Sequence, residues 1–294
     1  MTGFDSGDRE PPRPPPWFDE DRFARALAAR GCAWGAPLLA PREAASTNDL
    51  ALEGERAGLG EGATFIAFRQ SAGRGRRGNS WLSSPGENLT FSVLTRPERE
   101  LAATAPLPLV VGLALHDVVS ERIRAHAGWL REPVLVKWPN DVLVGSRKVA
   151  GVLVESRLRG SSVSAAVIGV GLNVLTESFP EEIAGRATSL ARAVRAAAPR
   201  LDRALLADHL AHEELLADVL CAIERRYRRF RGEGLAPFVP ELLAADGLRD
   251  QRVRVDGLEG VGAGITSTGA LRLVDQRGQE HSVSAGHVEL LGAR

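Results

Sequence analysis

The spacing of apolar residues changes several times along the chain, and each change marks an expected element. From residue 18 to residue 29 apolar side chains recur every three or four positions, which predicts an amphipathic helix. The short polar run Ser46-Thr47-Asn48 precedes another such pattern, and side chains of this kind cap helices. A long apolar helix is expected between residues 106 and 127, closing at Gly128.

Strands are indicated where apolar residues alternate with polar ones or form short continuous runs. We expect them at residues 63–70, 89–95, 134–138 and 162–174. The segment "PNDVLVGSRKVAGVLVES" is expected to form a hairpin that turns at Gly145-Ser146. Helical spacing then returns and predicts one helix from about residue 202 to residue 231.

The pattern changes again after Gly247. Five short apolar runs, separated by Gly-rich turns, are typical of a small all-β module. The chain is therefore expected to be α+β, with a mixed α/β domain at residues 18–246 and a β-module at residues 247–294. Residues 1–17 have five prolines between positions 11 and 16, which predicts a disordered lead-in.

Composition narrows the function classes. The chain has 37 Lys and Arg against 37 Asp and Glu, and this balance is unlike that of a protein that binds nucleic-acid backbones. No uninterrupted apolar run reaches the roughly 18 residues of a membrane span, and no signal peptide is visible, so we expect a cytoplasmic protein. Cys32 and Cys221 lack metal-ligand spacing and are expected to be reduced, buried thiols.

One stretch, "QSAGRGRRGNSW", alternates Gly and Arg; we call residues 70–81 the Gly/Arg loop. It matches GxGxxG, but the segment that follows contains Pro85 and Gly86 and then a strand, whereas a dinucleotide site needs a helix there. A solvated basic loop remains an alternative. Because glycines let backbone fold around a ligand and arginines offer forked donors, the loop predicts an anion site.

Two further stretches contain residues that a strand or hairpin alone does not need. In "VKWPNDVLVGSRKVAGVLVES", Lys137 and Lys148 lie in mostly apolar strands, which suggests charges directed at a buried partner. In "IGVGLNV", Gly169 and Gly171 thin a strand, which often marks close approach of a ligand. The alternatives are a decorated hairpin and, for Ser46-Thr47-Asn48, a helix cap alone.

Three other patterns favour structural roles. His209 and His212 lie three residues apart on the expected long helix, but no carboxylate completes a zinc motif, so we expect surface histidines. The glycines of "GVGAGITSTG" fall within short strands and are expected in turns. No Walker A motif occurs in the sequence, so any use of ATP is not of the P-loop kind.

The motifs "STN", "QSAGRGRRGNSW", "KWPND", "RKVAG" and "GVGLN", in this order, resemble those of the biotin–protein ligases. The resemblance is close from Ser46 to Asn173 and looser beyond. It implies the catalytic fold shared with class II aminoacyl-tRNA synthetases and biotin–lipoyl ligases, followed by an SH3-like β-barrel. It also implies that biotin and ATP form biotinyl-5′-AMP, with Mg²⁺ on the phosphates, before biotin passes to a lysine of an apo biotin carboxyl carrier domain of a carboxylase.

The same resemblance implies roles for individual residues. The catalytic cations would be Lys148, Arg74 and Arg76. Biotin would be bound by Ser46, Thr47, Asn48, Gln70, Arg74, Gly75, Arg76, Lys148, Gly151, Gly169 and Gly171. ATP and the adenylate would be bound by Arg77, Trp81, Lys137, Asn140, Asp141 and Asn173. Protein ligands of Mg²⁺ are not implied.

Two positions depart from the family pattern. Asn79 stands where a further arginine is common, and His287 stands where an acidic residue is expected. Some members carry an N-terminal DNA-binding domain, but only 45 residues precede Ser46, so we expect no DNA binding. A homodimer is compatible with the sequence. The competing functions are a lipoate ligase or octanoyltransferase, and a protein that senses biotinyl-AMP without catalysis.

Overall fold

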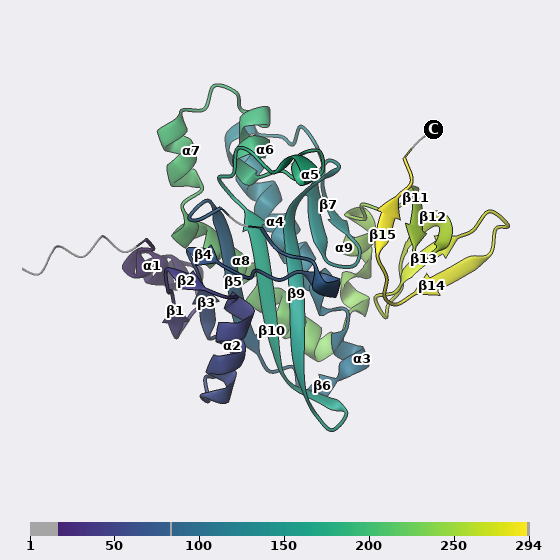
Figure 1. Cartoon of the computed structure of the whole chain (residues 1–294), viewed down its shortest axis with the longest axis horizontal. Helices are drawn as coiled ribbons and strands as arrows, with labels where there is room; N and C mark the ends of the chain where they lie inside the picture. Colours follow the sequence, from purple (N-terminus) through teal and green to yellow (C-terminus); the bar gives the residue numbers. More distant parts are fainter. Residues whose placement is uncertain (1–16, 83, 293–294) are drawn as a thin grey trace, which may run out of the picture.

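The fold has a main sheet covered by helices and a smaller C-terminal sheet that lies beside it (Figure 1). The computed structural model describes residues 17–82 and 84–292. Residues 1–16 of the expected lead-in lie outside the described part, whereas Trp17 donates its indole N–H to the carbonyl of Ala40 at 3.1 Å. Figure 1 shows the C-terminal strands, in yellow-green, beside the end of the main sheet that carries β7.

The main sheet has eight strands among the described residues. Its hydrogen-bonded order is β1-β3-β5-β10-β9-β8-β7, with β6 pairing with β10. The strands are β1 (Leu38–Leu39), β3 (Thr64–Ile66), β5 (Asn88–Thr95), β6 (Arg99–Glu100), β7 (Val134–Lys137), β8 (Asp141–Val144), β9 (Arg147–Arg159) and β10 (Ser162–Asn173). The β1–β3 pair is parallel and its neighbour β3–β5 is antiparallel, so the sheet is mixed, as predicted. A separate parallel pair joins β2 (Glu43–Ala44) to β4 (Arg69–Gln70).

Helices cover this sheet. They are α1 (Glu20–Arg30), α2 (Thr47–Arg56), α3 (Leu101–Thr104), α4 (Leu107–Ala127), α5 (Glu181–Ala184), α6 (Leu190–Ala197), α7 (Arg203–His209), α8 (His212–Glu233) and α9 (Val239–Ala244), with short 3-10 turns η1 (Arg76–Gly78) and η2 (Ala236–Phe238). Helix α4 packs against α8, α6 and the strands β7, β8 and β9, and α1 packs on α8. Helix α2 packs on β3, β5 and β10 instead.

The alternation of side chains along β5 and β10 places these two helix sets on opposite faces. Successive residues of a strand point to opposite sides of the sheet. In β10, Ile168 and Val170 belong to the large core with α4 and α8, whereas Val167 joins a small core with Ala51 of α2. By the same alternation Gly169 faces the α2 side. The α2 face therefore holds a small apolar core and leaves room for polar groups.

Helix α4 is the most apolar helix and ends as the sequence predicts. Its C-cap is Gly128, whose φ of 70° is the left-handed conformation that glycine adopts readily. By length and composition alone, the stretch Leu101–Ala125 could cross a membrane, with a mean hydropathy of 1.6. However, 67% of the most apolar 18-residue segment in this stretch is buried inside the protein. This is the environment of a core helix.

The C-terminal part is a five-stranded antiparallel sheet with the order β14-β13-β12-β11-β15. Its strands are β11 (Arg252–Val255), β12 (Leu258–Ile265), β13 (Leu271–Val274), β14 (Glu280–Val283) and β15 (Val288–Leu290). The number of strands agrees with the sequence pattern. Trp138, just after β7, donates its indole N–H to the carbonyl of Gly269 at 2.9 Å and so joins the two sheets.

Two local expectations were wrong. The single helix expected over residues 202–231 is broken at Leu210 and Ala211, where Ala211 has an extended ψ of 130°. Leu206 and Leu210 face the core from α7. In a continuous helix, at about 100° per residue, Leu215 would point away from the core. The break turns α8 so that Leu215 also faces the core. The strand expected over residues 63–70 is also interrupted: β3 pairs with β1 and β5, whereas β4 pairs with β2.

Candidate active site

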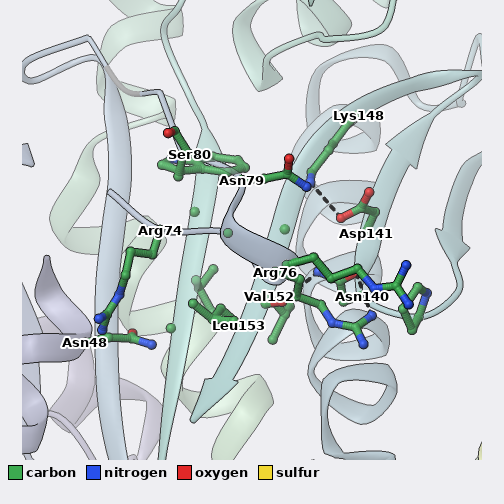
Figure 2. Close-up of a pocket in the computed structure, with 18 of the residues that line it drawn as sticks. Asn48, Arg74, Arg76, Asn79, Ser80, Asn140, Asp141, Lys148, Val152 and Leu153 are labelled. Carbon is green, nitrogen blue, oxygen red and sulfur yellow. Dashed lines mark hydrogen bonds and ion pairs between the residues drawn. The ribbon is translucent and has the colours of Figure 1, made fainter. Parts of the chain in front are cut away.

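A pocket lies on the α2 face of the main sheet, next to the C-terminal module. The space between its walls is about 980 Å³, part of which is open to solvent. It is lined by every residue that the family resemblance assigned to biotin or ATP, except Asn173. The Asn173 amide instead donates to the carbonyl of Thr188 at 3.0 Å. Figure 2 shows Asn48 and Arg74 at one end, and Arg76, Asn140, Asp141 and Lys148 at the other.

The first end is built on the N-terminus of α2. The Ser46 hydroxyl caps this helix by accepting from the backbone N–H of Asn48 at 3.3 Å. The side-chain carbonyl of Gln70 accepts from the Thr47 backbone N–H at 2.8 Å. Ser92 of β5 donates to the Asn48 side-chain oxygen at 2.6 Å and contacts the Thr47 hydroxyl at 2.8 Å. Ser46 therefore caps the helix, as one interpretation of the sequence held, and the same three residues line the pocket, as the other held.

The strand glycines make room for side chains that line the pocket. A Cβ at Gly169 would lie 2.1 Å from the Asn48 side-chain oxygen, and one at Gly171 would lie 2.2 Å from the Trp81 ring. The sequence predicted that these glycines let a ligand approach the backbone. In the described structure the space above them holds Asn48 and Trp81, so the glycines set the depth of these two side chains.

The Gly/Arg loop folds back on itself above the pocket. Gly75 N–H donates to the Asn79 carbonyl at 2.7 Å, and Trp81 N–H donates to the Gly73 carbonyl at 2.9 Å. A Cβ at Gly73 would lie 2.5 Å from the Trp81 carbonyl oxygen, so this tight return requires glycine. Because the loop joins two strands through one 3-10 turn, the dinucleotide fold is absent here, as expected.

The three arginines of the loop have different surroundings. Arg74 contacts Asp49 at 2.8 Å and Glu155 at 2.9 Å. Arg77 makes two hydrogen bonds of 2.8 Å to the carboxylate of Asp256, in the C-terminal module. For Arg76, no carboxylate of the described residues lies within ion-pair distance.

Arg76 is the arginine available to a ligand. Its guanidinium reaches the Asn140 side-chain oxygen at 3.5 Å, the outer limit of a hydrogen bond. Burial lowers the pKa of Arg76, and the positive charge of Arg77 lowers it further, while Asp141 acts in the opposite direction. A half-buried cation with so weak a partner is suited to an incoming anion.

The β8–β9 hairpin presents Lys148 to the same pocket. The register shifts between Val142 and Leu143, so that β9 contains a bulge. Both Val149 and Ala150 are consequently buried in the large core. Without the bulge, strict alternation would place Lys148 on the core face with Ala150; with it, Lys148 lines the pocket.

Lys148 has two neighbours of opposite character. Its ammonium nitrogen lies 2.7 Å from a carboxylate oxygen of Asp141. Figure 2 marks this ion pair with a dashed line. The same nitrogen lies 5.4 Å from the centre of the Trp81 ring, within cation–π distance. The indole nitrogen of Trp81 has no hydrogen-bond partner within the described ranges, although it is buried.

Lys137, at the end of β7, is more buried and has no paired carboxylate among the described residues. Its ammonium reaches the Val288 carbonyl at 3.4 Å. Burial lowers its pKa; the charges of Lys148 and Arg186 do so too, against the opposing effect of Asp141. Five Lys and Arg side chains line the pocket, and three of them, Arg76, Lys137 and Lys148, lie at the end that holds its lining carboxylate, Asp141. The electrostatic field at this end is therefore net positive.

Sequence reasoning missed a residue that supports the pocket lining and residues of the lining itself. Glu155 of β9 accepts from the Asn48 amide at 2.6 Å and from Arg74, and its spacing of four from Gly151 on the same strand could have indicated it. The C-terminal module contributes Gly286, His287 and Val288 to the lining. Of these three, the sequence analysis noted only His287, as a departure from the family pattern. No local pattern marks Gly286 and Val288, because they meet the pocket only through the packing of the two sheets.

Comparison with known proteins agrees with this geometry. Residues 40–173 match the model of the biotin/lipoate A/B protein ligase family. The biotin–[acetyl-CoA-carboxylase] ligase of Mycobacterium tuberculosis is 32% identical over 294 residues, covering 96% of this chain and 98% of that protein. The chain belongs to the biotin protein ligase family.

Other biotin protein ligases extend the similarity to solved structures. The Aquifex aeolicus ligase in complex with biotin and ATP superposes with a TM-score of 0.68 at 28% identity, covering 88% of this chain and 100% of that one. The bifunctional ligase/repressor BirA of Bacillus subtilis is 33% identical over 60% of this chain, but the match spans only 49% of that longer protein.

His209 and His212 lie away from the pocket and on different helices. His209 donates its Nε2–H to the Arg122 carbonyl, 2.8 Å away. His212 was expected at the surface, but its Nε2 is buried and has no partner among the described residues. Burial lowers the pKa of this imidazole, with Glu213 opposing. No group of three metal-ligating side chains is found in the described part of the chain.

Proposed function

We propose that this protein is an ATP-dependent biotin–protein ligase. The observation that carries the proposal is one pocket in which a cap of short polar groups lies at one end and three cations lie at the other. The similar Aquifex aeolicus ligase is described in complex with biotin and ATP. Biotin has a neutral polar ring and a carboxylate, and ATP has a polyanionic chain, so the two ends suit the two substrates.

The proposed reaction has two steps. A carboxylate oxygen of biotin attacks the α-phosphorus of ATP, an O–P bond forms, and the bond to the β-phosphate breaks to release pyrophosphate. The amine of an acceptor lysine then attacks the acyl carbon, loses a proton and displaces AMP. We propose that the acceptor is an apo biotin carboxyl carrier domain of a carboxylase.

Biotin would occupy the end built on α2. Ser46, Thr47, Asn48 and Gln70 offer donors and acceptors to its ureido ring. Glu155, which also accepts from Arg74, fixes the position of Asn48. Gly169 lets Asn48 lie deep against the sheet. The carboxylate of biotin would then point toward Lys148 and Arg76, with Gly75 and Gly151 leaving space along its path.

ATP would occupy the other end. The Trp81 ring offers a face for the adenine, and Arg77, Lys137 and Asn140 surround the phosphates. We propose that Asn173 acts only from behind the strand, since it does not line the pocket. Mg²⁺ bound to the phosphates would neutralise part of their charge. Asp141, whose carboxylate lines the pocket, is the protein ligand that we propose for it.

Lys148 would be the main catalytic cation. Biotin's carboxylate and the α-phosphate repel one another, and negative charge increases on the phosphate oxygens in the transition state. A fixed ammonium between them offsets both effects in a site of low dielectric constant. In the free protein Asp141 holds this ammonium at 2.7 Å, so substrate binding exchanges one anionic partner for another.

The remaining parts of the proposal concern the whole chain. We propose a catalytic domain at residues 18–246 and an SH3-like module at residues 247–294 that completes the nucleotide end. We further propose that the protein acts in the cytoplasm, and that it binds neither specific DNA nor membranes, given its balanced charge.

Transfer to an acceptor tests this function. Purified protein, ATP and Mg²⁺ are mixed with an apo carrier domain and with biotin, lipoate or octanoate in turn, and the acceptor is weighed by mass spectrometry. We expect the mass of biotin to be added, and a carrier whose target lysine is changed to arginine to remain unmodified. Modification with lipoate or octanoate and not with biotin would contradict the proposal.

A further inference from the structure

The Gly/Arg loop is joined to the C-terminal module by one ion pair. Arg77 uses two guanidinium nitrogens on the two carboxylate oxygens of Asp256, each at 2.8 Å. About half of each side chain is exposed, 47% for Arg77 and 48% for Asp256. The pair therefore bridges two parts of the fold that are 179 residues apart in sequence.

Asp256 is held in place from its own side. It lies in the turn between β11 and β12 with a φ of 45°, next to Gly257 with a φ of 94°. One of its carboxylate oxygens also accepts from the backbone N–H of His287 at 3.0 Å. A Cβ at Gly286 would lie 2.2 Å from Val255, so the His287 segment packs directly against this hairpin. The carboxylate is consequently preset to receive Arg77.

Turn formation alone does not account for a carboxylate at this position. Asp-Gly and Asn-Gly are both favoured where two successive residues have positive φ, because their short side chains tolerate that conformation. The turn would thus form equally well with a neutral amide. The negative charge has a separate use, and the hydrogen bonds from Arg77 and from His287 hold the pKa of Asp256 below its usual range.

Within the Gly/Arg loop, Arg77 is the residue that ties the loop backbone to the C-terminal module. It lies in the middle of η1 with a φ of 55°, the left-handed region that side-chain-bearing residues rarely adopt. Its neighbour Arg76 points to Asn140 on the other side of the turn. Since the two guanidinium groups belong to adjacent residues, a fixed Arg77 restricts the direction that Arg76 can take.

We infer that Asp256 is a positioning residue, which holds Arg77 on the C-terminal module and thereby keeps Arg76 beside Asn140 over the pocket. Its effect on nucleotide binding rests on the proposed function, whereas its effect on the loop does not. Asp256 would touch no reacting group itself. It acts through Arg77, and the C-terminal module acts through Asp256.

Hydrogen–deuterium exchange of the unliganded protein tests the effect on the loop. The variant is Asp256→Asn, which preserves the turn and removes the charge. The control is Glu280→Gln, because Glu280 forms a similar two-bond pair with Arg272 in the same module, at 2.8 and 2.7 Å, away from the pocket. The measured segment is residues 70–82, in which the amides of Gly75, Asn79 and Trp81 donate to carbonyls within the loop.

We expect exchange in this segment to be roughly two- to fivefold faster in Asp256→Asn, as the loss of a half-exposed ion pair implies, and unchanged in Glu280→Gln. Raising the salt concentration should accelerate exchange in the wild type toward that of Asp256→Asn, because screening weakens the pair. Equal exchange in the wild type and Asp256→Asn at low salt would overturn the inference, whatever the activity of the protein.

A double-mutant cycle on pyrophosphate exchange tests the effect on the nucleotide. Asp256→Asn and Arg77→Gln should each raise the KM for ATP severalfold with little change in kcat. The double variant should be no worse than the poorer single variant, because both remove the same pair. A KM increase in the double variant equal to the product of the single increases would overturn the coupling. A wild type with no exchange would contradict the proposed function but leave the loop measurement valid.

Discussion

The charge of Arg76 should retain the adenylate, and Arg76→Gln measures its contribution. In the described structure its one polar contact is the 3.5 Å approach to Asn140, and no described carboxylate pairs with it. Folding should therefore lose little when the charge is removed. Gln is preferred to Gly because Gly would also add backbone freedom in η1 and confuse the two effects.

The magnitude follows from the hydrogen bond that the substitution removes. A hydrogen bond between a charged donor and an anionic phosphate contributes about 1.5–3 kcal/mol. This corresponds to roughly 10- to 150-fold in a dissociation constant. We expect most of that factor in the dissociation rate of biotinyl-5′-AMP, because changes in affinity among variants of one site arise mainly from dissociation.

The assay is release of labelled biotinyl-5′-AMP from the enzyme after rapid dilution, beside a thermal melt. The control is Arg69→Gln, which removes an exposed arginine that lies 3.8 Å from Glu43 on the β2–β4 pair. We expect Arg76→Gln to release the adenylate at least roughly tenfold faster with an unchanged melting temperature. A release rate equal to that of the wild type and of Arg69→Gln would refute the role given to Arg76.

Two other predictions concern Glu155 and His212. Glu155→Gln removes the anionic acceptor of Arg74 and Asn48 and should raise the KM for biotin about tenfold more than the KM for ATP, as steady-state exchange kinetics can show; equal changes in both constants would argue against a biotin-side role. His212 has a folded-state pKa below the usual histidine value of 6.5, so the unfolded state binds the extra proton first and stability should fall as pH drops below about 6.5. Urea unfolding at about pH 7.5 and about pH 5.5 should show a smaller loss in His212→Gln than in the wild type, and parallel losses would contradict the assignment.

Much of the fold could be predicted because its elements are encoded locally. The Ser46 cap, the closing Gly128 and the hairpin turn each depend on residues adjacent in sequence. The break at Ala211 could not be predicted as easily. Helical spacing continues on both sides of it, and only the direction of the buried face shows that α7 and α8 are separate.

The site was predictable to the extent that its residues form motifs. All of the residues that the motifs assigned to biotin or ATP, except Asn173, line one pocket. The orientation of Lys148 was beyond sequence reasoning, since it depends on a bulge that moves Val149 into the core. Asp256 was also missed, because an Asp in an Asp-Gly turn has a sufficient local explanation and its partner Arg77 is distant in sequence.

The Lys148 ammonium is the group on which the proposed chemistry depends most. It lies on the pocket face of β9, 2.7 Å from Asp141 and against the Trp81 ring. Removal of one such stabilising group commonly lowers a rate by about 10²–10³. Lys148→Arg retains the charge on a larger planar head and should restore activity only in part.

The central claim is that this pocket joins biotin to ATP, and biotin-dependent exchange of labelled pyrophosphate into ATP measures that reaction directly. We expect exchange by the wild type only when biotin is present, a loss of about 10²–10³ in Lys148→Ala, and partial recovery in Lys148→Arg, with melting temperatures that show all three to be folded. No biotin-dependent exchange by the folded wild type, or near-normal exchange by a folded Lys148→Ala, would contradict it.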